Sequence, residues 1–165
     1  MEYRKDRSLV EALLKYGNKK AIVQDTDYIS YIELAVMIET IGKNMRNMRF
    51  SSVVIHIPDK MHVMMVVLSC MNVGIPFIVL DWNNPKAFSE KILSEAETTE
   101  VIYEGDINLD SIKSIHLNQL MNPSDSAREA IIDTNERVLF YIATSGSTGN
   151  SKVTVQYNTG YLPDW

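Results

Sequence analysis

The stretch that decides the fold reads Tyr-Ile-Ala-Thr-Ser-Gly-Ser-Thr-Gly-Asn-Ser-Lys and covers residues 141–152. An apolar run at residues 138–143 ends where a segment of small polar residues begins, and a single lysine, Lys152, closes that segment. The glycines allow backbone N–H groups to turn towards an anion, the hydroxyls add donors, and the lysine adds a full positive charge. The pattern therefore predicts a strand followed by a phosphate-binding loop.

Several common phosphate-loop motifs do not fit these residues. A Walker A loop places lysine directly after a glycine, whereas Ser151 precedes Lys152 and Val153 follows it. The dinucleotide motif G-x-G-x-x-G fails because only Gly146 and Gly149 are present. The G-x-x-G loop of RNA-binding KH domains joins two helices, whereas this loop follows a strand-like run in an acidic chain. The KH-type loop is therefore a disfavoured alternative, and a polar surface turn between two strands is a second one.

Composition narrows the class of protein. The chain has 165 residues, a formal net charge of -5, 45% hydrophobic residues and 22% charged residues, which is typical of one soluble globular domain. The negative charge argues against nucleic acid as a partner. The lone cysteine, Cys70, lies in an apolar run, which predicts a core position. A single cysteine cannot form an intrachain disulfide, which fits a reducing compartment. Because no apolar run is long enough to span a bilayer, we expect a cytoplasmic protein without a membrane partner.

The apolar pattern alternates between the periods of helices and strands. Helices are predicted at residues 8–16, 31–48, 60–73 and 86–96, and strands at residues 21–24, 28–30, 52–57, 75–80, 100–103, 114–117, 138–143 and 153–157. Ser30 and Glu33 have the spacing of a capping box at the start of the second helix. This alternation predicts an α/β fold in which helices flank a mainly parallel sheet.

Other candidate sites are weaker. His56 and His62 have no third ligand at a suitable spacing, so no metal site is predicted. Ser145 and Ser147 do not lie in a G-x-S-x-G nucleophile elbow, and no catalytic residue is assigned. Asp81 follows a predicted strand, where its simplest role is to cap the next turn.

The loop resembles the T-S-G-S-T-G-x-P-K-G core loop of adenylate-forming enzymes, and further signatures of that family occur upstream in the family's order. Residues 29–34 resemble L-T-Y-x-E-L, residues 68–85 resemble L-x-x-x-K-A-G-x-x-Y-V-P-x-D-P-x-x-P, and residues 92–96 resemble I-L-x-D-A. The resemblance covers about residues 9–152, whereas residues 153–165 form a divergent tail. It is strongest to the N-terminal part of amino-acid adenylation domains of nonribosomal peptide synthetases, followed by acyl-CoA synthetase-like enzymes.

The chain also departs from these signatures. Ser151 stands where the loop motif has proline, and Val153 stands where it has glycine. Asn72 and Val73 replace the usual lysine and alanine of the middle signature. The substitutions at residues 151 and 153 remove one rigid turn and add bulk beside the lysine, so we expect reduced phosphate affinity.

The resemblance implies a function. Enzymes of this family join a carboxylate to the α-phosphate of ATP, release pyrophosphate, and usually pass the acyl group to a thiol. By resemblance, the β- and γ-phosphates of ATP would be held by Thr144, Ser145, Gly146, Ser147, Thr148, Gly149 and Lys152. ATP and Mg²⁺ are the implied cofactors of the complete enzyme. Its implied partners are a carboxylate substrate and a carrier protein or CoA.

The resemblance also implies how residues 1–165 are organised. They correspond to a single N-terminal portion of an AMP-binding domain, the first subdomain of that fold. The family's adenine-binding segment, ribose-binding aspartate, Mg²⁺-linked acidic residue and C-terminal lysine have no counterpart among them. We therefore expect an N-terminal fragment that does not adenylate by itself. The alternatives are a free-standing phosphate- or nucleotide-binding module and a non-catalytic protein that recruits a partner through an exposed sheet edge.

Overall fold

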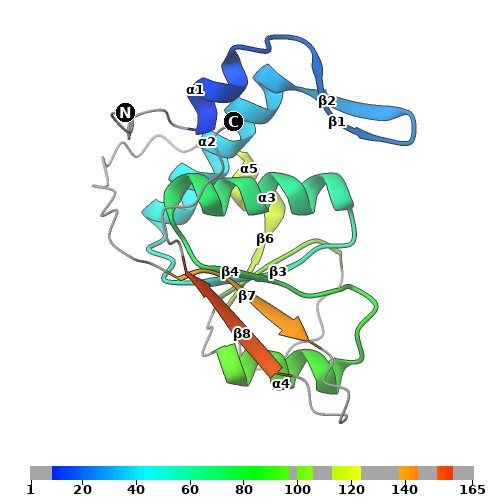
Figure 1. Ribbon diagram of the computed structural model, residues 1–165, viewed down its shortest axis with the longest axis vertical. Helices are drawn as coiled ribbons and strands as arrows, with labels where there is room; N and C mark the ends of the chain where they lie inside the picture. The colour runs from blue at the N-terminus through cyan, green and yellow to red at the C-terminus, as the bar shows by residue number, and fades with distance from the viewer. Residues whose placement is uncertain (1–8, 97–99, 106–112, 124–137, 145–151, 158–165) are drawn as a thin grey trace, which may run out of the picture.

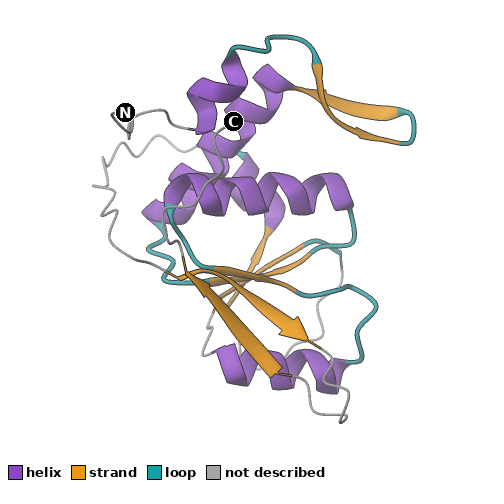
Figure 2. Cartoon of the chain, viewed as in Figure 1, coloured by secondary structure: helices purple, strands orange, loops and turns teal. Residues whose placement is uncertain are grey.

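The computed structural model describes residues 9–96, 100–105, 113–123, 138–144 and 152–157. These residues form a β-hairpin, a six-stranded sheet and helices around the sheet (Figure 1 and Figure 2). The elements in chain order are α1 (Leu9–Leu14), β1 (Lys20–Gln24), β2 (Asp27–Ser30), α2 (Tyr31–Asn47), β3 (Val53–His56), α3 (Lys60–Val73), β4 (Phe77–Val79), α4 (Lys86–Ala96), β5 (Glu100–Tyr103), β6 (Lys113–His116), α5 (Leu117–Met121), β7 (Val138–Thr144) and β8 (Lys152–Tyr157).

The six-stranded sheet has the strand order β6-β5-β3-β4-β7-β8. Neighbouring strands from β6 to β7 pair in parallel, and β8 pairs antiparallel with β7. Helix α3 connects β3 to β4, and α4 connects β4 to β5 on the other side of β3. The predicted α/β fold with a mainly parallel sheet flanked by helices is therefore confirmed.

The two faces of the sheet are covered by different helices. Helices α2, α3 and α5 lie on one face, and α4 lies on the other (Figure 1). Alternate residues of β3 follow this division, because Ile55 belongs to the core under α2 and α3, whereas Val54 packs with Ile92 and Leu93 of α4. Strand β3 is thus buried on both faces, as is usual for an apolar strand of a parallel sheet.

Helix α2 begins at the predicted capping box. The hydroxyl of Ser30 accepts a hydrogen bond from the backbone N–H of Glu33 at 3.3 Å, and the Glu33 carboxylate accepts one from the Ser30 N–H at 2.9 Å. The two bonds satisfy donors that the helix itself leaves unpaired. The prediction made for Ser30 and Glu33 is therefore confirmed.

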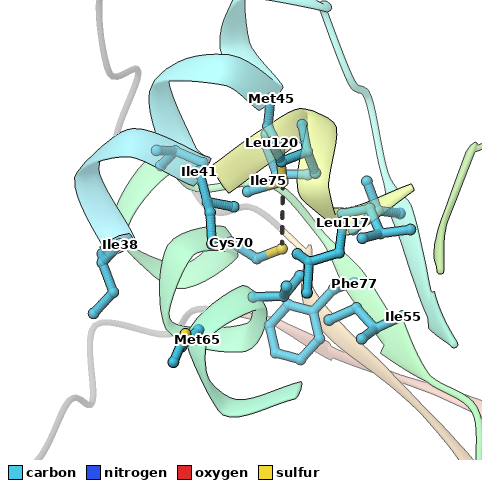
Figure 3. Packing of buried hydrophobic residues seen from close by; sticks show 14 of the residues in the cluster. Ile38, Ile41, Met45, Ile55, Met65, Cys70, Ile75, Phe77, Leu117 and Leu120 are labelled. Atoms are coloured by element: carbon cyan, nitrogen blue, oxygen red, sulfur yellow. Dashed lines mark hydrogen bonds between the residues drawn. The ribbon is translucent and has the colours of Figure 1, made fainter. Parts of the chain in front are cut away.

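Cys70 lies in the main core, where Figure 3 shows its side chain among apolar residues of α2, α3 and α5. Its sulfur lies 4.0 Å from the sulfur of Met45. Burial raises the pKa of the Cys70 thiol, so the thiol stays protonated and unreactive. The predicted core position is confirmed. Among the described residues, no helix is both long and apolar enough to cross a membrane.

Helices α2 and α3 approach each other closely at Gly42. A Cβ atom added to Gly42 would lie 2.5 Å from Cγ1 of Val73, which is closer than two carbon atoms can pack. Val73 cannot easily move aside, because a β-branched side chain in a helix has one strongly preferred rotamer. The absence of a side chain at Gly42 therefore sets the spacing of the two helices.

This contact predicts that Gly42→Ala destabilises the protein. Overpacking costs about 1–3 kcal/mol, which exceeds the gain of about 0.5–1 kcal/mol that alanine usually gives over glycine inside a helix. We expect a net loss of about 1 kcal/mol in urea unfolding. In a double-mutant cycle, Val73→Ala should remove most of the penalty of Gly42→Ala. Equal penalties in both backgrounds would contradict the proposed clash.

Candidate functional site

The carboxyl ends of the parallel strands meet at one edge of the sheet. Ligands of α/β proteins generally bind at this edge, because loops and helix N-termini converge there. The order β5-β3-β4-β7 places the ends of these four strands side by side. We call this the carboxyl edge and describe its residues from β7 towards β6.

The backbone brings the two ends of the predicted phosphate loop together at this edge. Thr144 is the last residue of β7, Lys152 is the first residue of β8, and the two are partners in the antiparallel ladder. The other predicted site residues, Ser145, Gly146, Ser147, Thr148 and Gly149, lie outside the described residues. The predicted loop thus connects two paired strands at the carboxyl edge.

Strand β4 lies beside β7 and is followed by a polar turn. The carboxylate of Asp81 accepts hydrogen bonds from the backbone N–H of Asn83 at 2.9 Å and from its side-chain amide at 3.2 Å. The backbone carbonyl of Asp81 accepts a bond from the N–H of Asn84 at 3.1 Å. The predicted role of Asp81 as a turn cap is confirmed.

At the end of β3, the imidazole of His56 stacks on Trp82. The ring centroids are 4.7 Å apart and the planes are inclined by 26°. Trp82 in turn lies against Gly105, where φ is +79° and an added Cβ would come within 3.3 Å of the indole. Only glycine combines this backbone conformation with so close a neighbour. The end of β3 and the segments after β4 and β5 therefore pack together here.

The environment of His56 disfavours its charged form. Burial lowers the pKa of His56, while a hydrogen bond with the backbone of Leu80 opposes this shift without cancelling it. Its Nδ1 atom is buried and has no hydrogen-bond partner within the described part of the chain. The folded protein therefore holds His56 as neutral imidazole at neutral pH.

The N-terminus of α3 is capped by side chains. Asp59 accepts a bond from the N–H of His62 at 2.9 Å, and Gln24 of the hairpin accepts one from the N–H of Met61 at 3.0 Å. The Gln24 amide also donates to the carboxylate of Asp59 at 3.1 Å. Burial raises the pKa of Asp59, but these hydrogen bonds outweigh burial and the net shift is downward. This helix end is therefore already occupied and does not offer its N–H groups to a phosphate.

His62 also forms a hydrogen bond across the carboxyl edge. Its Nδ1 lies 2.9 Å from the carboxylate of Glu104, which follows β5, and 4.0 Å from that of Asp59. The side chains of His62 and Glu104 are only 30% and 25% exposed. Sequence reasoning missed this pair, because its members are 42 positions apart and become neighbours only through the strand order.

No metal cluster completes this region in the part of the chain that the structure describes. No group of three or more His, Cys, Asp or Glu side chains there could hold a metal ion. One open groove of about 210 Å³ lies on α2, away from the predicted site residues, and is lined by Val36, Glu39, Thr40, Lys43, Asn44 and Pro123.

No family model and no curated protein matches the sequence. The fold, however, is similar to solved structures. The N-terminal subdomain of NpsA from Klebsiella oxytoca, solved with 3-hydroxybenzoyl-AMSN, matches with a TM-score of 0.75 and 19% identity over 88% of this chain and 39% of that chain. NpsA-ThdA from the same organism, an artificially fused adenylation-PCP di-domain, matches with a TM-score of 0.76 and 19% identity over 88% of this chain and 31% of that chain.

A second enzyme gives a similar match. O-succinylbenzoate coenzyme A synthetase (MenE) from Bacillus subtilis, solved with AMP, has a TM-score of 0.76 and 12% identity over 90% of this chain and 42% of that chain. Another structure of MenE holds ATP and a magnesium ion. The chain thus has the fold of the N-terminal subdomain of adenylate-forming enzymes, as the motif resemblance predicts. It spans 31–42% of the length of these three chains.

The lowered pKa of His56 predicts that stability falls in mild acid. The unfolded chain takes up a proton at His56 near the ordinary histidine pKa of about 6.5, whereas the folded protein does so only at lower pH. The free energy of unfolding should therefore decrease as pH falls below about 6.5, by at most about 1.4 kcal/mol per pH unit for this one proton.

Urea unfolding of wild type and His56→Phe between pH 5 and 8 measures this contribution. Phenylalanine keeps a ring on Trp82 but cannot titrate, so the gap between the two stability curves should change as the pH is lowered. Curves that stay parallel would show that His56 has the same pKa in both states.

Proposed function

We propose that this chain supplies the N-terminal, phosphate-binding part of an ATP-dependent adenylating enzyme. Residues 1–165 form a single portion of the AMP-binding domain. The enzyme activates an amino acid or another carboxylic acid as acyl-AMP and releases pyrophosphate. In this reaction a carboxylate oxygen bonds to the α-phosphorus of ATP, and the bond from that phosphorus to the bridging oxygen of pyrophosphate breaks.

The chemical problem in this reaction is negative charge. A carboxylate must approach a triphosphate, so the leaving pyrophosphate has to be neutralised by donors and cations that are already in position. The predicted loop matches this need, because Thr144, Ser145, Ser147 and Thr148 supply hydroxyl donors and Lys152 supplies a charge. Gly146 and Gly149 let the backbone approach the phosphate oxygens. Magnesium supplies the remaining positive charge when it is bound with ATP.

One observation carries the proposal. The two described ends of the loop, Thr144 and Lys152, are ladder partners at the carboxyl edge, in a fold that is similar to that of adenylation enzymes. A polar turn without a function would not need the phosphate-loop motif at the carboxyl edge of such a fold. The neighbouring structures that hold AMP, ATP with magnesium, and an acyl-AMSN give the proposal its ligand class.

The remaining parts of the reaction belong to the complete enzyme. The carboxylate substrate, and a carrier protein or CoA as acyl acceptor, are proposed partners of that enzyme. In this chain we assign residues that bind phosphate and none that carries out the chemistry. ATP-binding is therefore the activity that this chain can be tested for.

Titration with phosphate ligands tests the proposal. We expect ATP and pyrophosphate to bind with similar, weak affinity, because only phosphate-binding groups are proposed here. Lys152→Ala should weaken both about tenfold or more, since a charge-assisted hydrogen bond contributes about 1.5–3 kcal/mol. Lys60→Ala, which removes an exposed lysine at the start of α3, is the matched control. NMR titrations of labelled protein give the affinities.

Two results would change the assignment. Equal binding by wild type and Lys152→Ala would contradict a phosphate loop. Specific micromolar binding of ATP in strong preference to pyrophosphate would favour a free-standing nucleotide-binding module instead. We also expect no amino-acid-dependent pyrophosphate exchange by the 165-residue chain, and measurable exchange would contradict the assignment of catalytic groups to other parts of the enzyme.

A further inference from the structure

We propose that the stack of His56 on Trp82 is a pH-sensitive contact, which closes the switch point of the sheet at neutral pH and releases Trp82 in mild acid. The switch point lies between the ends of β3 and β5, two neighbouring strands whose outgoing connections run to opposite sides of the sheet. Ligands of open α/β sheets generally bind in a crevice at such a point. Nothing in this contact depends on the proposed phosphate loop.

Trp82 bridges the ends of the two strands. Its indole stacks on the imidazole of His56, the last residue of β3, with the ring centroids 4.7 Å apart. On the side of β5 the six-membered ring of the indole lies against Gly105, two residues after the strand, where an added Cβ would come within 3.3 Å of Cη2. The position of the indole therefore decides whether the switch point is covered.

The stack suits His56 only in its neutral form. The Nδ1 atom of His56 is buried and has no hydrogen-bond partner among the described residues. Neutral imidazole needs no donor at this position, because its single proton can lie on the other nitrogen. Protonation would place an N–H group and a positive charge there without an acceptor, which is costly in a buried place. When Trp82 moves away, water can solvate the charged ring, so a proton binds more tightly to the open arrangement than to the stack.

The acidic side chains on the elements around His56 are bound to other groups. Burial is the main reason for the lowered pKa of His56, and a hydrogen bond with the backbone of Leu80 opposes it. The other titratable rings on this side are Tyr103, the partner of His56 on β5, and His116, which contacts Tyr103 edge-on. The acidic groups and their partners are Asp81 with Asn83, Asp59 with the N–H of His62, Glu104 with the imidazole of His62, and Glu90 with Lys86.

Acid should therefore shift the stack towards the open arrangement. With Trp82 released, His56 takes up a proton near the ordinary histidine pKa of about 6.5, whereas in the stack it does so only at lower pH. The ratio of open to stacked molecules is constant above this range and rises as the pH falls through it, by up to about tenfold per pH unit. Trp82 and Gly105 lie outside the helices and strands, so the release can be local while the core stays folded.

The fluorescence of Trp82 tests this proposal in the folded protein. The chain has two tryptophans, so Trp165→Phe leaves Trp82 as the only one. Between pH 8 and pH 5 we expect its emission to shift to the red and its quenching by acrylamide to increase, while the far-ultraviolet circular dichroism stays constant. His56→Phe in the same background keeps a ring on Trp82 but cannot take up a proton, so both pH responses should be lost.

The other two histidines of the chain give matched controls. His62→Gln keeps a donor for Glu104, and His116→Asn keeps a side chain that can cap α5, so both variants should retain the response of Trp82. The proposal is wrong if Trp165→Phe shows no response, if the response persists in His56→Phe, or if it disappears in either control. A red shift that coincides with a loss of circular dichroism would also overturn it, because the whole chain would then be unfolding.

Discussion

The burial of strand β3 on both faces is the constraint on which the rest of the structure depends. Val53, Val54 and Ile55 are completely buried, with the core of α2 and α3 on one side and that of α4 on the other. A strand covered by helices on both faces has parallel neighbours, since its connections must cross over the sheet. The carboxyl ends of β3, β4, β5 and β7 therefore meet at one edge, and the site proposed here exists only because of this arrangement.

The two halves of the carboxyl edge differ in how they are filled. The chain leaves β3 towards β4 and leaves β5 towards β6, in opposite directions along the sheet. An α/β sheet usually opens a crevice at such a point. Here that place is taken by the stack of His56 on Trp82 and by the pair of His62 and Glu104. At the end of β4, by contrast, Val79 and Asp81 are exposed.

The sequence predicted the elements well because their signals are local. The capping box of Ser30 and Glu33, and the apolar run of β3, each act over a few residues. The pairing of His62 with Glu104, and the bonds from the buried amide of Asn44 to the backbone carbonyls of Leu120 and Asn122, depend on strand order and could not be read from periodicity. The sequence identified Asp81 as a turn cap because that signal is local as well.

The departures of the loop from the family motif acquire a physical meaning in this fold. Val153 stands where the motif has glycine. In β8 it occupies the ladder position opposite Ala143 of β7. A β-branched residue suits such a ladder position. Strand β8 begins one residue earlier, at Lys152. The backbone of Lys152 is then fixed by its pairing with Thr144, and less of its freedom remains to be lost when phosphate binds. The serine at residue 151 acts in the opposite direction, because it lacks the fixed φ that the proline of the motif provides. If the loop binds phosphate as proposed, its affinity is set by the balance between a lysine whose backbone is paired and the absence of that proline.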